Sequence, residues 1–143
     1  MNYLVATHGE FSKGIIDAAQ LIIGKSTQID QFSMTKSKAQ DEAEEEVKEY
    51  LEKMRGQDLV VLTDVFGGSV ANLFTDFLLK GYKFQLVTGV NLPLVLTMLL
   101  SGNTDSKTAI TSSIEEAKNG IIYINELIEN QGGEHYDDRI IED

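Results

Sequence analysis

The sequence predicts an α/β fold, a doubly wound and mostly parallel sheet with helices on both faces. Short apolar runs alternate along the chain with segments whose apolar residues recur at helical spacing, which gives the element order β-α-β-α-β-α-β. The run Leu59–Leu62 is apolar on both faces, as a central parallel strand is. With 143 residues and one proline, the chain is long enough for one domain with a hydrophobic core and carries no proline-rich linker.

Composition narrows the classes of function. The 23 acidic residues outnumber the 12 basic ones and give a net charge of −11, which argues against binding nucleic acid or an anionic membrane through a broad basic surface. The chain has no cysteine, which excludes disulfides and thiolate metal sites. No basic, apolar leader opens the sequence, and its longest apolar stretch, Leu92–Leu100, is too short to cross a bilayer. These features predict a soluble, cytoplasmic protein.

The first half of the chain is expected to form two strands and two helices. Tyr3–Ala6 is predicted to be a short buried strand and Gln28–Phe32 a weaker, more polar one. Between them, a helical stripe ends at Gly24; its members are Phe11, Ile15, Ala18, Ala19 and Ile22. Ser37–Gln40 has the Ser-x-x-Gln form of a capping box, which predicts the start of the second helix. The apolar stripe of that helix is Ala43, Val47, Tyr50, Leu51 and Met54.

The alternation continues after the strand Leu59–Leu62. Ser69 is predicted to cap the next helix, which Gly81 ends. The apolar residues of this helix are Val70, Leu73, Phe74, Phe77 and Leu78. Phe84–Val87 supplies the fourth strand of the predicted sheet.

The last part of the chain is expected to hold two helices and a fifth strand. Asn91–Pro93 starts a helix that reaches about residue 100, because proline is tolerated in a first helical turn. Ser112 is predicted to cap a further helix to about Asn119. Ile121–Ile124 then reads as a short strand; a helix running on to Asn130 is the alternative.

The strand order locates a candidate site. Placing the two most apolar strands, the first and the third, side by side gives the order 2-1-3-4, and ligands bind such sheets at the carboxyl ends of the central strands. His8 directly follows the first strand and Asp64 directly follows the third, so the two are expected to meet there. Beside Asp64, the glycine-rich turn Val65–Ser69 leads into a helix N-terminus, whose amides form a seat for a phosphoryl group.

Each of these features also has a purely structural explanation. A histidine in a loop is more often structural than catalytic, a Gly-Gly-Ser turn is often only a turn, and an aspartate after a strand is commonly a helix cap. Their convergence at one end of the sheet is what favours a functional site.

At these residues the chain resembles the mannose-type enzyme IIA domains of the bacterial phosphoenolpyruvate-dependent sugar phosphotransferase system. The matching motifs stand at three strand ends: Thr7-His8-Gly9, Asp64-x-x-Gly67-Gly68-Ser69 and Gly89-Val90-Asn91-Leu92-Pro93. The resemblance covers about residues 1–124. Many members of the family have proline directly after the Gly-Gly-Ser, where this chain has Val70, a residue that a first helical turn also accepts.

The resemblance implies a phosphoryl carrier. His8 is expected to accept a phosphoryl group on Nε2 from the small carrier protein HPr and to pass it to a sugar-specific IIB component, which works with the membrane components IIC and IID. Asp64 is expected to accept a hydrogen bond from Nδ1 of the imidazole and so fix its tautomer. The residues expected to bind the phosphoryl oxygens are Gly67, Gly68 and Ser69, with Thr7 supporting them. Asn91 and Pro93 are expected to shape the rim.

A homodimer is also implied. In the family, the strand corresponding to Ile121–Ile124 pairs antiparallel with the sheet of the other subunit. The segment is apolar on both faces here, which an exposed edge strand avoids. An edge strand covered by helices of the same chain is the alternative. The domain is taken as residues 1–130, and residues 131–143, with His135, as a polar tail whose histidine is a bystander.

Other functions stay open at this point. No Walker motif or metal-ligand cluster is evident, and the acidic residues of segment 41–46 match the helix dipole as a solvated face, so no cofactor, nucleotide or metal is expected. The alternatives are a regulatory module that senses phosphorylation, a phosphoryl donor for a dihydroxyacetone kinase, and a hydrolase with Ser69, His8 and Asp64 as a triad. The hydrolase requires the Ser69 oxygen within hydrogen-bond reach of His8, and the chain has no G-x-S-x-G motif.

Overall fold

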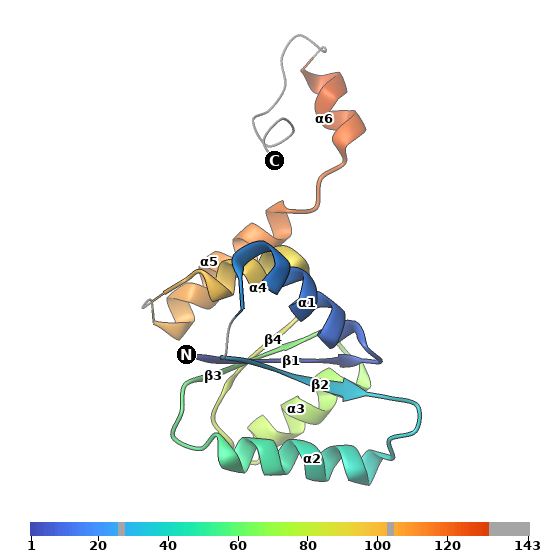
Figure 1. The fold of residues 1–143 in the computed structure, drawn as a ribbon, viewed down its shortest axis with the longest axis vertical. Coiled ribbons are helices and arrows are strands. Elements are labelled where there is room, and N and C mark those ends of the chain that lie inside the picture. Colours follow the sequence, from blue (N-terminus) through green and yellow to red (C-terminus); the bar gives the residue numbers. More distant parts are fainter. Residues whose placement is uncertain (26–27, 103–104, 132–143) are drawn as a thin grey trace.

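The computed structural model describes residues 1–25, 28–102 and 105–131 of the chain, and its centre is a parallel sheet (Figure 1). The strands are β1 (Asn2–His8), β2 (Ile29–Met34), β3 (Leu59–Thr63) and β4 (Gln85–Thr88). They pair in parallel in the order β2-β1-β3-β4. The α/β class and the strand order 2-1-3-4 expected from the sequence are therefore confirmed.

Helices cover both faces of the sheet (Figure 1). One face carries α2 (Gln40–Lys53) and α3 (Ser69–Leu79). The other face carries α1 (Phe11–Ile23), α4 (Leu92–Leu99) and α5 (Ser106–Asn119). This layering follows from parallel pairing, because each crossover must pass over one face of the sheet to bring the chain back to the start of the next strand.

The two central strands are buried on both faces. Leu4 and Val61 face the layer of α2 and α3, whereas Val5 and Leu62 face the layer of α1, α4 and α5. Each of these four side chains is exposed by 2% or less. Burial of one such side chain contributes roughly 1.5–3 kcal/mol, so the apolar sequences of β1 and β3 hold these strands at the centre.

Two helices begin at other residues than the sequence indicates. The N-cap of α2 is Ala39 rather than Ser37, whose hydroxyl oxygen lies 3.3 Å from that of Thr35. The N-cap of α5 is Asp105, whose carboxylate accepts the backbone N–H of Thr108 at 3.1 Å. Ser112 therefore lies inside α5, since a capping carboxylate is available about two helical turns earlier.

The fifth strand expected at Ile121–Ile124 is not seen. Residues 121–123 form neither strand nor helix, and α6 (Ile124–Asn130) follows them, so the alternative of a helix reaching Asn130 is closer to the structure. A strand needs a neighbour for its backbone hydrogen bonds, and the described part of this chain places none beside the segment. Instead the segment leads away from the body of the fold, and α6 stands apart from the sheet (Figure 1).

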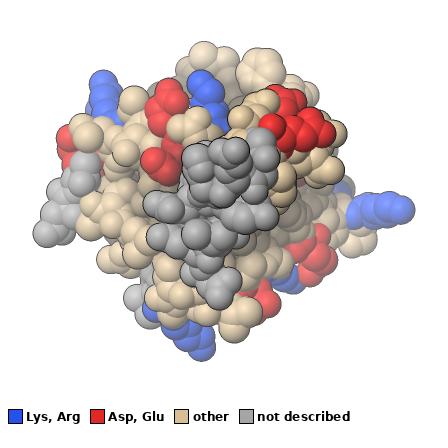
Figure 2. Space-filling model, turned by 90° about the horizontal axis from the view of Figure 1, so that it is seen from above, with Lys and Arg blue, Asp and Glu red and all other residues tan. Residues whose placement is uncertain are grey.

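Charge is distributed without a dominant basic region on the face shown in Figure 2. There the lysine and arginine side chains stand apart from one another, with acidic and uncharged residues between them. Among the described residues, no helix combines the length and the apolar character needed to cross a bilayer.

Candidate functional site

The carboxyl ends of β1 and β3 bring His8 and Asp64 together. His8 is the last residue of β1, and Asp64 directly follows β3, the neighbouring parallel strand. Imidazole Nδ1 lies 2.9 Å from Asp64 Oδ2, and the same oxygen accepts the backbone N–H of His8 at 3.0 Å. One carboxylate oxygen thus holds both the backbone and the ring of the histidine.

The environment of Asp64 keeps its carboxyl group ionised. Burial by itself would raise the pKa of Asp64, but hydrogen bonds from the backbone and the ring of His8 outweigh it and hold this pKa below its ordinary value. The Asp64 side chain is 12% exposed, whereas the His8 side chain is 47% exposed. The Asp64 carboxylate is therefore mostly buried, whereas the His8 imidazole is accessible to a partner protein.

Ser69 completes the contacts of the imidazole. Its hydroxyl oxygen lies 3.0 Å from Nε2 of His8. The prediction that Ser69 caps α3 is wrong, because Gly68 is the N-cap and Ser69 is the first residue of the helix. With Nδ1–H donated to Asp64, Nε2 is an acceptor, so the Ser69 hydroxyl donates to it.

The turn between β3 and α3 is held by its own hydrogen bonds. Gly67 has a φ of +81°, a conformation that favours glycine, and its carbonyl accepts the side-chain N–H of Asn72 at 3.2 Å. The N–H of Gly68 donates to the Val65 carbonyl at 3.1 Å, so this amide is already hydrogen-bonded within the turn. At the start of α3 the amides of Ser69 and Val70 have no carbonyl within the helix to pair with, as is general for the first residues of a helix.

Thr7 lies behind the site rather than in it. Its side chain is fully buried, and its hydroxyl accepts the backbone N–H of Ser12 at 2.7 Å and donates to the His8 carbonyl at 3.2 Å. Ser12, also fully buried, donates its own hydroxyl to Gln31 Oε1 at 3.0 Å. These contacts support the turn that follows His8. Sequence reasoning missed Ser12, whose only signal was a hydroxyl in the first turn of a helix.

The remaining candidates of the rim have structural contacts. Asn91 caps α4 by accepting the Leu94 N–H at 2.9 Å, and its amide donates to the Ala117 carbonyl at 3.1 Å. Pro93 occupies the first turn of α4 and lies against Gly120, where an added Cβ would come within 2.9 Å of the proline ring. Both residues therefore join α4 to α5. His135 lies outside the described residues.

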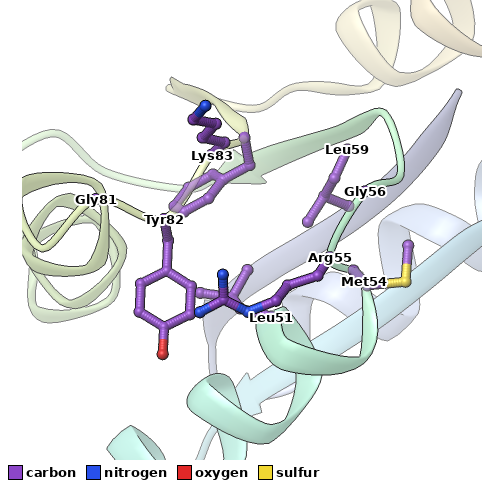
Figure 3. Close-up of a pocket in the computed structure, with 9 residues that line it drawn as sticks. Leu51, Met54, Arg55, Gly56, Leu59, Gly81, Tyr82 and Lys83 are labelled. Carbon is purple, nitrogen blue, oxygen red and sulfur yellow. The ribbon is translucent and has the colours of Figure 1, made fainter.

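A separate cavity of 230 Å³ lies at the opposite end of the sheet, beside the start of β3 (Figure 3). The Arg55 guanidinium lies over the Tyr82 ring, 5.0 Å from its centroid. Hydrogen bonds from Arg55 and from the Tyr82 hydroxyl hold the pKa of Glu52 at about 2. These contacts join the end of α2 to the loop after α3, and we assign them a packing role.

Comparison with known proteins identifies the family. The family model described as EIIA-man, the PTS system fructose IIA component, matches residues 2–118. The chain belongs to this family. It is an EIIA component of the mannose family, a phosphoryl-transfer protein of the sugar phosphotransferase system, and the resemblance stated from the sequence is confirmed.

Curated relatives of this EIIA component are similar over most of their length. It is 20% identical over 118 residues to the sorbose-specific EIIA component of the PTS of Lacticaseibacillus casei, covering 82% of this chain and 86% of that protein. It is 22% identical over 100 residues to the fructose-specific EIIA component of Bacillus subtilis (strain 168), covering 69% of this chain and 68% of the relative.

Solved structures share the fold of the EIIA component. A putative phosphoenolpyruvate-dependent sugar PTS permease from Klebsiella pneumoniae is 32% identical, with a TM-score of 0.77 over 89% of this chain and 93% of that one. The PTS IIA protein associated with the fucose utilization operon of Streptococcus pneumoniae is 25% identical, with a TM-score of 0.78 over 87% and 93% of the two chains.

Proposed function

We propose that this EIIA component is a phosphoryl carrier that accepts a phosphoryl group from phospho-HPr on Nε2 of His8 and passes it to a sugar-specific IIB component. The group then serves sugar uptake and phosphorylation through the membrane components IIC and IID, and we place the reaction in the cytoplasm. The observation that carries the proposal is the imidazole held by Asp64 through Nδ1, with its Nε2 at the exposed end of the sheet.

The hydrogen bond to Asp64 makes Nε2 the attacking atom of the imidazole. Asp64 accepts the Nδ1–H, so the lone pair for attack is on Nε2. This lone pair forms the new N–P bond, and the donor keeps the electron pair of the P–donor bond that breaks. The ring then carries a substituent on both nitrogens and hence a positive charge, which the Asp64 carboxylate stabilises.

Ser69 has two roles in this scheme. In the resting protein its hydroxyl donates to Nε2 at 3.0 Å and occupies the line of attack. Rotation of the side chain frees the lone pair and lets the hydroxyl donate to a phosphoryl oxygen. The first amides of α3 and the positive end of its dipole lie on the same side, so they favour the negative charge of the phosphoryl group.

Intact-mass measurement tests the proposal. Incubation with phosphoenolpyruvate, enzyme I and HPr is expected to add one phosphoryl group to the chain, and a cognate IIB component is expected to remove it. A chain that is phosphorylated but donates to no IIB component would favour the regulatory module, and transfer to a dihydroxyacetone kinase system would favour that alternative. A chain that gains no phosphoryl group would contradict the proposal.

The Gly68 position offers a further test of the geometry. A Cβ added there would lie 3.2 Å from Cε1 of His8 and 3.2 Å from the Val65 carbonyl oxygen, which is tighter than ordinary contact. Gly68→Ala is therefore expected to displace the imidazole and slow phosphorylation of His8 by about tenfold or more, measured in a single turnover. Gly14→Ala is the control, since nothing lies within 4 Å of its added Cβ. Equal rates in the two variants would show that the imidazole tolerates displacement.

One observation favours a second candidate, the serine hydrolase. Ser69 Oγ, His8 and Asp64 are joined by contacts of 3.0 and 2.9 Å, which meets the distance requirement of a catalytic triad. A fluorophosphonate probe separates the two functions. The phosphoryl carrier is expected to leave Ser69 unlabelled, because its hydroxyl acts as a donor and not as a nucleophile. Stoichiometric labelling of Ser69 would instead establish the hydrolase.

We also propose that the chain forms a homodimer through its C-terminal segment. Ile121 is 81% exposed, Tyr123 71% and Ile124 52%, and the segment stands away from the body of the fold (Figure 1). Apolar residues that adjoin one another and face water indicate an interface. Light scattering is expected to give a dimer for the intact chain and a monomer for a chain cut after Asn119. A dimer that survives the cut would place the interface elsewhere.

A further inference from the structure

The backbone around His8 is held by hydrogen bonds on both sides. The His8 N–H donates to Asp64 at 3.0 Å, and the His8 carbonyl accepts the Thr7 hydroxyl at 3.2 Å. The N–H of Gly9, in the same peptide group as that carbonyl, donates to the Met34 carbonyl at 2.9 Å. Only two residues separate His8 from the start of α1. Because this connection is short, the position of the first turn of α1 limits where the His8 backbone can lie.

Ser12 joins the first turn of α1 to two strands. Its backbone N–H donates to the Thr7 hydroxyl of β1 at 2.7 Å, and that hydroxyl donates in turn to the His8 carbonyl. Its own hydroxyl is directed to β2, where it lies 3.0 Å from Oε1 of Gln31 and 3.2 Å from the carbonyl oxygen of Phe32. Ser12 is fully buried, and a buried hydroxyl without an acceptor carries a desolvation cost. The hydrogen bonds of Ser12 therefore fix the start of α1 against both β1 and β2.

Gln31 is the side-chain acceptor on β2. Its Oε1 accepts the hydroxyl of Ser12 at 3.0 Å and that of Ser33 at 2.8 Å. In the described sheet β2 is an edge strand that pairs only with β1, so backbone hydrogen bonds hold it on one side. The carboxamide gives this edge strand a second connection, to α1. We name the hydrogen-bonded group of Ser12, Gln31 and Ser33 the Gln31 bridge.

We propose that Ser12 is a positioning residue for phosphorylation of His8, and that the Gln31 bridge holds Ser12 in place. This inference rests on the proposed function. Ser12 acts through the backbone of His8, whose direction sets where the imidazole lies between Asp64 and Ser69, at 2.9 and 3.0 Å from its two ring nitrogens. A displacement of about 1 Å at a reacting atom can slow a reaction by roughly 100-fold.

Replacing Ser12 with alanine tests the inference with two phosphoryl donors. With phospho-HPr, Ser12→Ala is expected to lower kcat by about 5- to 50-fold and to leave KM within about twofold, because the imidazole is displaced and the surface that binds the donor is not. With phosphoramidate, a small donor, the rate is expected to fall by the same factor. A purely structural role would lower the stability of the fold but not kcat at temperatures well below the unfolding transition, which circular dichroism locates.

Ser113→Ala is the matched control. Ser113 is likewise a fully buried serine within a helix, α5, and among the described residues its hydroxyl has no hydrogen-bond partner. This variant is expected to transfer at the unaltered rate. Equal kcat in the two variants would overturn the inference. So would a rise in KM at unchanged kcat, because Ser12 would then act on binding of the donor.

Gln31 offers a second test, because its side chain is exposed and its replacement leaves the core intact even if Ser12→Ala does not fold. Gln31→Met removes the acceptor at a similar side-chain length and is expected to lower kcat by about threefold or more. The effect is smaller than that of Ser12→Ala, since the Phe32 carbonyl remains as an acceptor for Ser12. Gln31→Glu keeps an acceptor oxygen and is expected to restore most of kcat. Unchanged kcat in Gln31→Met, or equal slowing in both Gln31 variants, would contradict the role of the bridge.

Amide hydrogen exchange gives a readout that does not depend on phosphoryl transfer. Exchange of the Gly9 N–H is expected to be about tenfold faster in Ser12→Ala than in Ser113→Ala, because the turn after His8 opens more often. Unchanged exchange would show that Ser12 does not hold this backbone and would overturn the inference. If neither donor labels His8 in the unaltered chain, the proposed function fails and the positioning role with it. If the unaltered chain is labelled but Ser12→Ala shows neither slower transfer nor faster exchange, the function stands and only this inference is wrong.

Discussion

Replacing His8 with alanine is expected to abolish transfer of the phosphoryl group from phospho-HPr to this EIIA component. The variant lacks the imidazole that contacts both the Asp64 carboxylate and the Ser69 hydroxyl, and with it the Nε2 lone pair. In the unaltered chain, the label is expected to be lost in acid and retained in base, as a phosphoramidate bond is. Radiolabel from phosphoenolpyruvate, followed by gel electrophoresis under alkaline conditions, measures both properties.

His135→Ala is the matched control for this prediction. It removes the second histidine of the chain, which lies in the tail outside the described residues, and it is expected to leave the label unchanged. Label that persists on the His8→Ala protein would show that another residue accepts the phosphoryl group. The assignment of His8 would then be wrong.

Replacing Asp64 with asparagine is expected to slow phosphorylation of His8 while the fold is retained. The neutral amide keeps the size of the side chain but removes the charge that stabilises the phosphorylated ring, and it offers an N–H that competes with Nδ1–H. Loss of an orienting acid lowers such rates by roughly ten- to ten-thousand-fold. Rapid-quench measurement of a single turnover with phospho-HPr gives the rate, and circular dichroism checks the fold.

Asp76→Asn is the control for the loss of one negative charge. Asp76 is an exposed residue of α3, so its replacement changes the net charge equally without a contact to the imidazole. It is expected to transfer at the unaltered rate. An Asp64→Asn protein that reacts as fast as the Asp76→Asn protein would contradict the orienting role of Asp64.

The order of the strands and the proximity of His8 to Asp64 could be predicted from the sequence, because both depend on which strands are buried on both faces. Strands that are apolar on both faces have to lie at the centre of a sheet, and this alone places the ends of β1 and β3 side by side. The residues that follow two neighbouring parallel strands then share one edge, whatever their separation in the sequence. The proximity of His8 and Asp64 follows from this topology.

The hydroxyl groups of the site could not be assigned in the same way. Ser69 reads as a helix cap, but the backbone of Gly68 fills that position and the hydroxyl turns to the imidazole. Thr7 reads as a residue near the phosphoryl group, but its hydroxyl caps the first turn of α1 through the Ser12 N–H. A hydroxyl has several acceptors and donors within reach at a strand end, and the sequence does not rank them.

The C-terminal segment shows a different limit. Ile121–Ile124 has the composition of a strand, yet strand formation requires a paired neighbour, and a neighbour is a property of the whole assembly. In the single chain the isoleucine at 124 instead begins α6, where Leu127 and Ile128 follow at helical spacing. The local sequence pattern of this segment favours a strand, but the segment does not form one because no neighbouring strand pairs with it in the described part of the chain.

Mapping the phosphorylated residue tests the central claim most directly. The unaltered chain is incubated with phosphoenolpyruvate, enzyme I and HPr, digested at alkaline pH, and sequenced by tandem mass spectrometry. We expect one phosphoryl group, on the peptide that contains His8 and on the histidine itself. A phosphoryl group on Ser69 or His135, with His8 unmodified, would contradict the assignment of His8 as the phosphorylated residue.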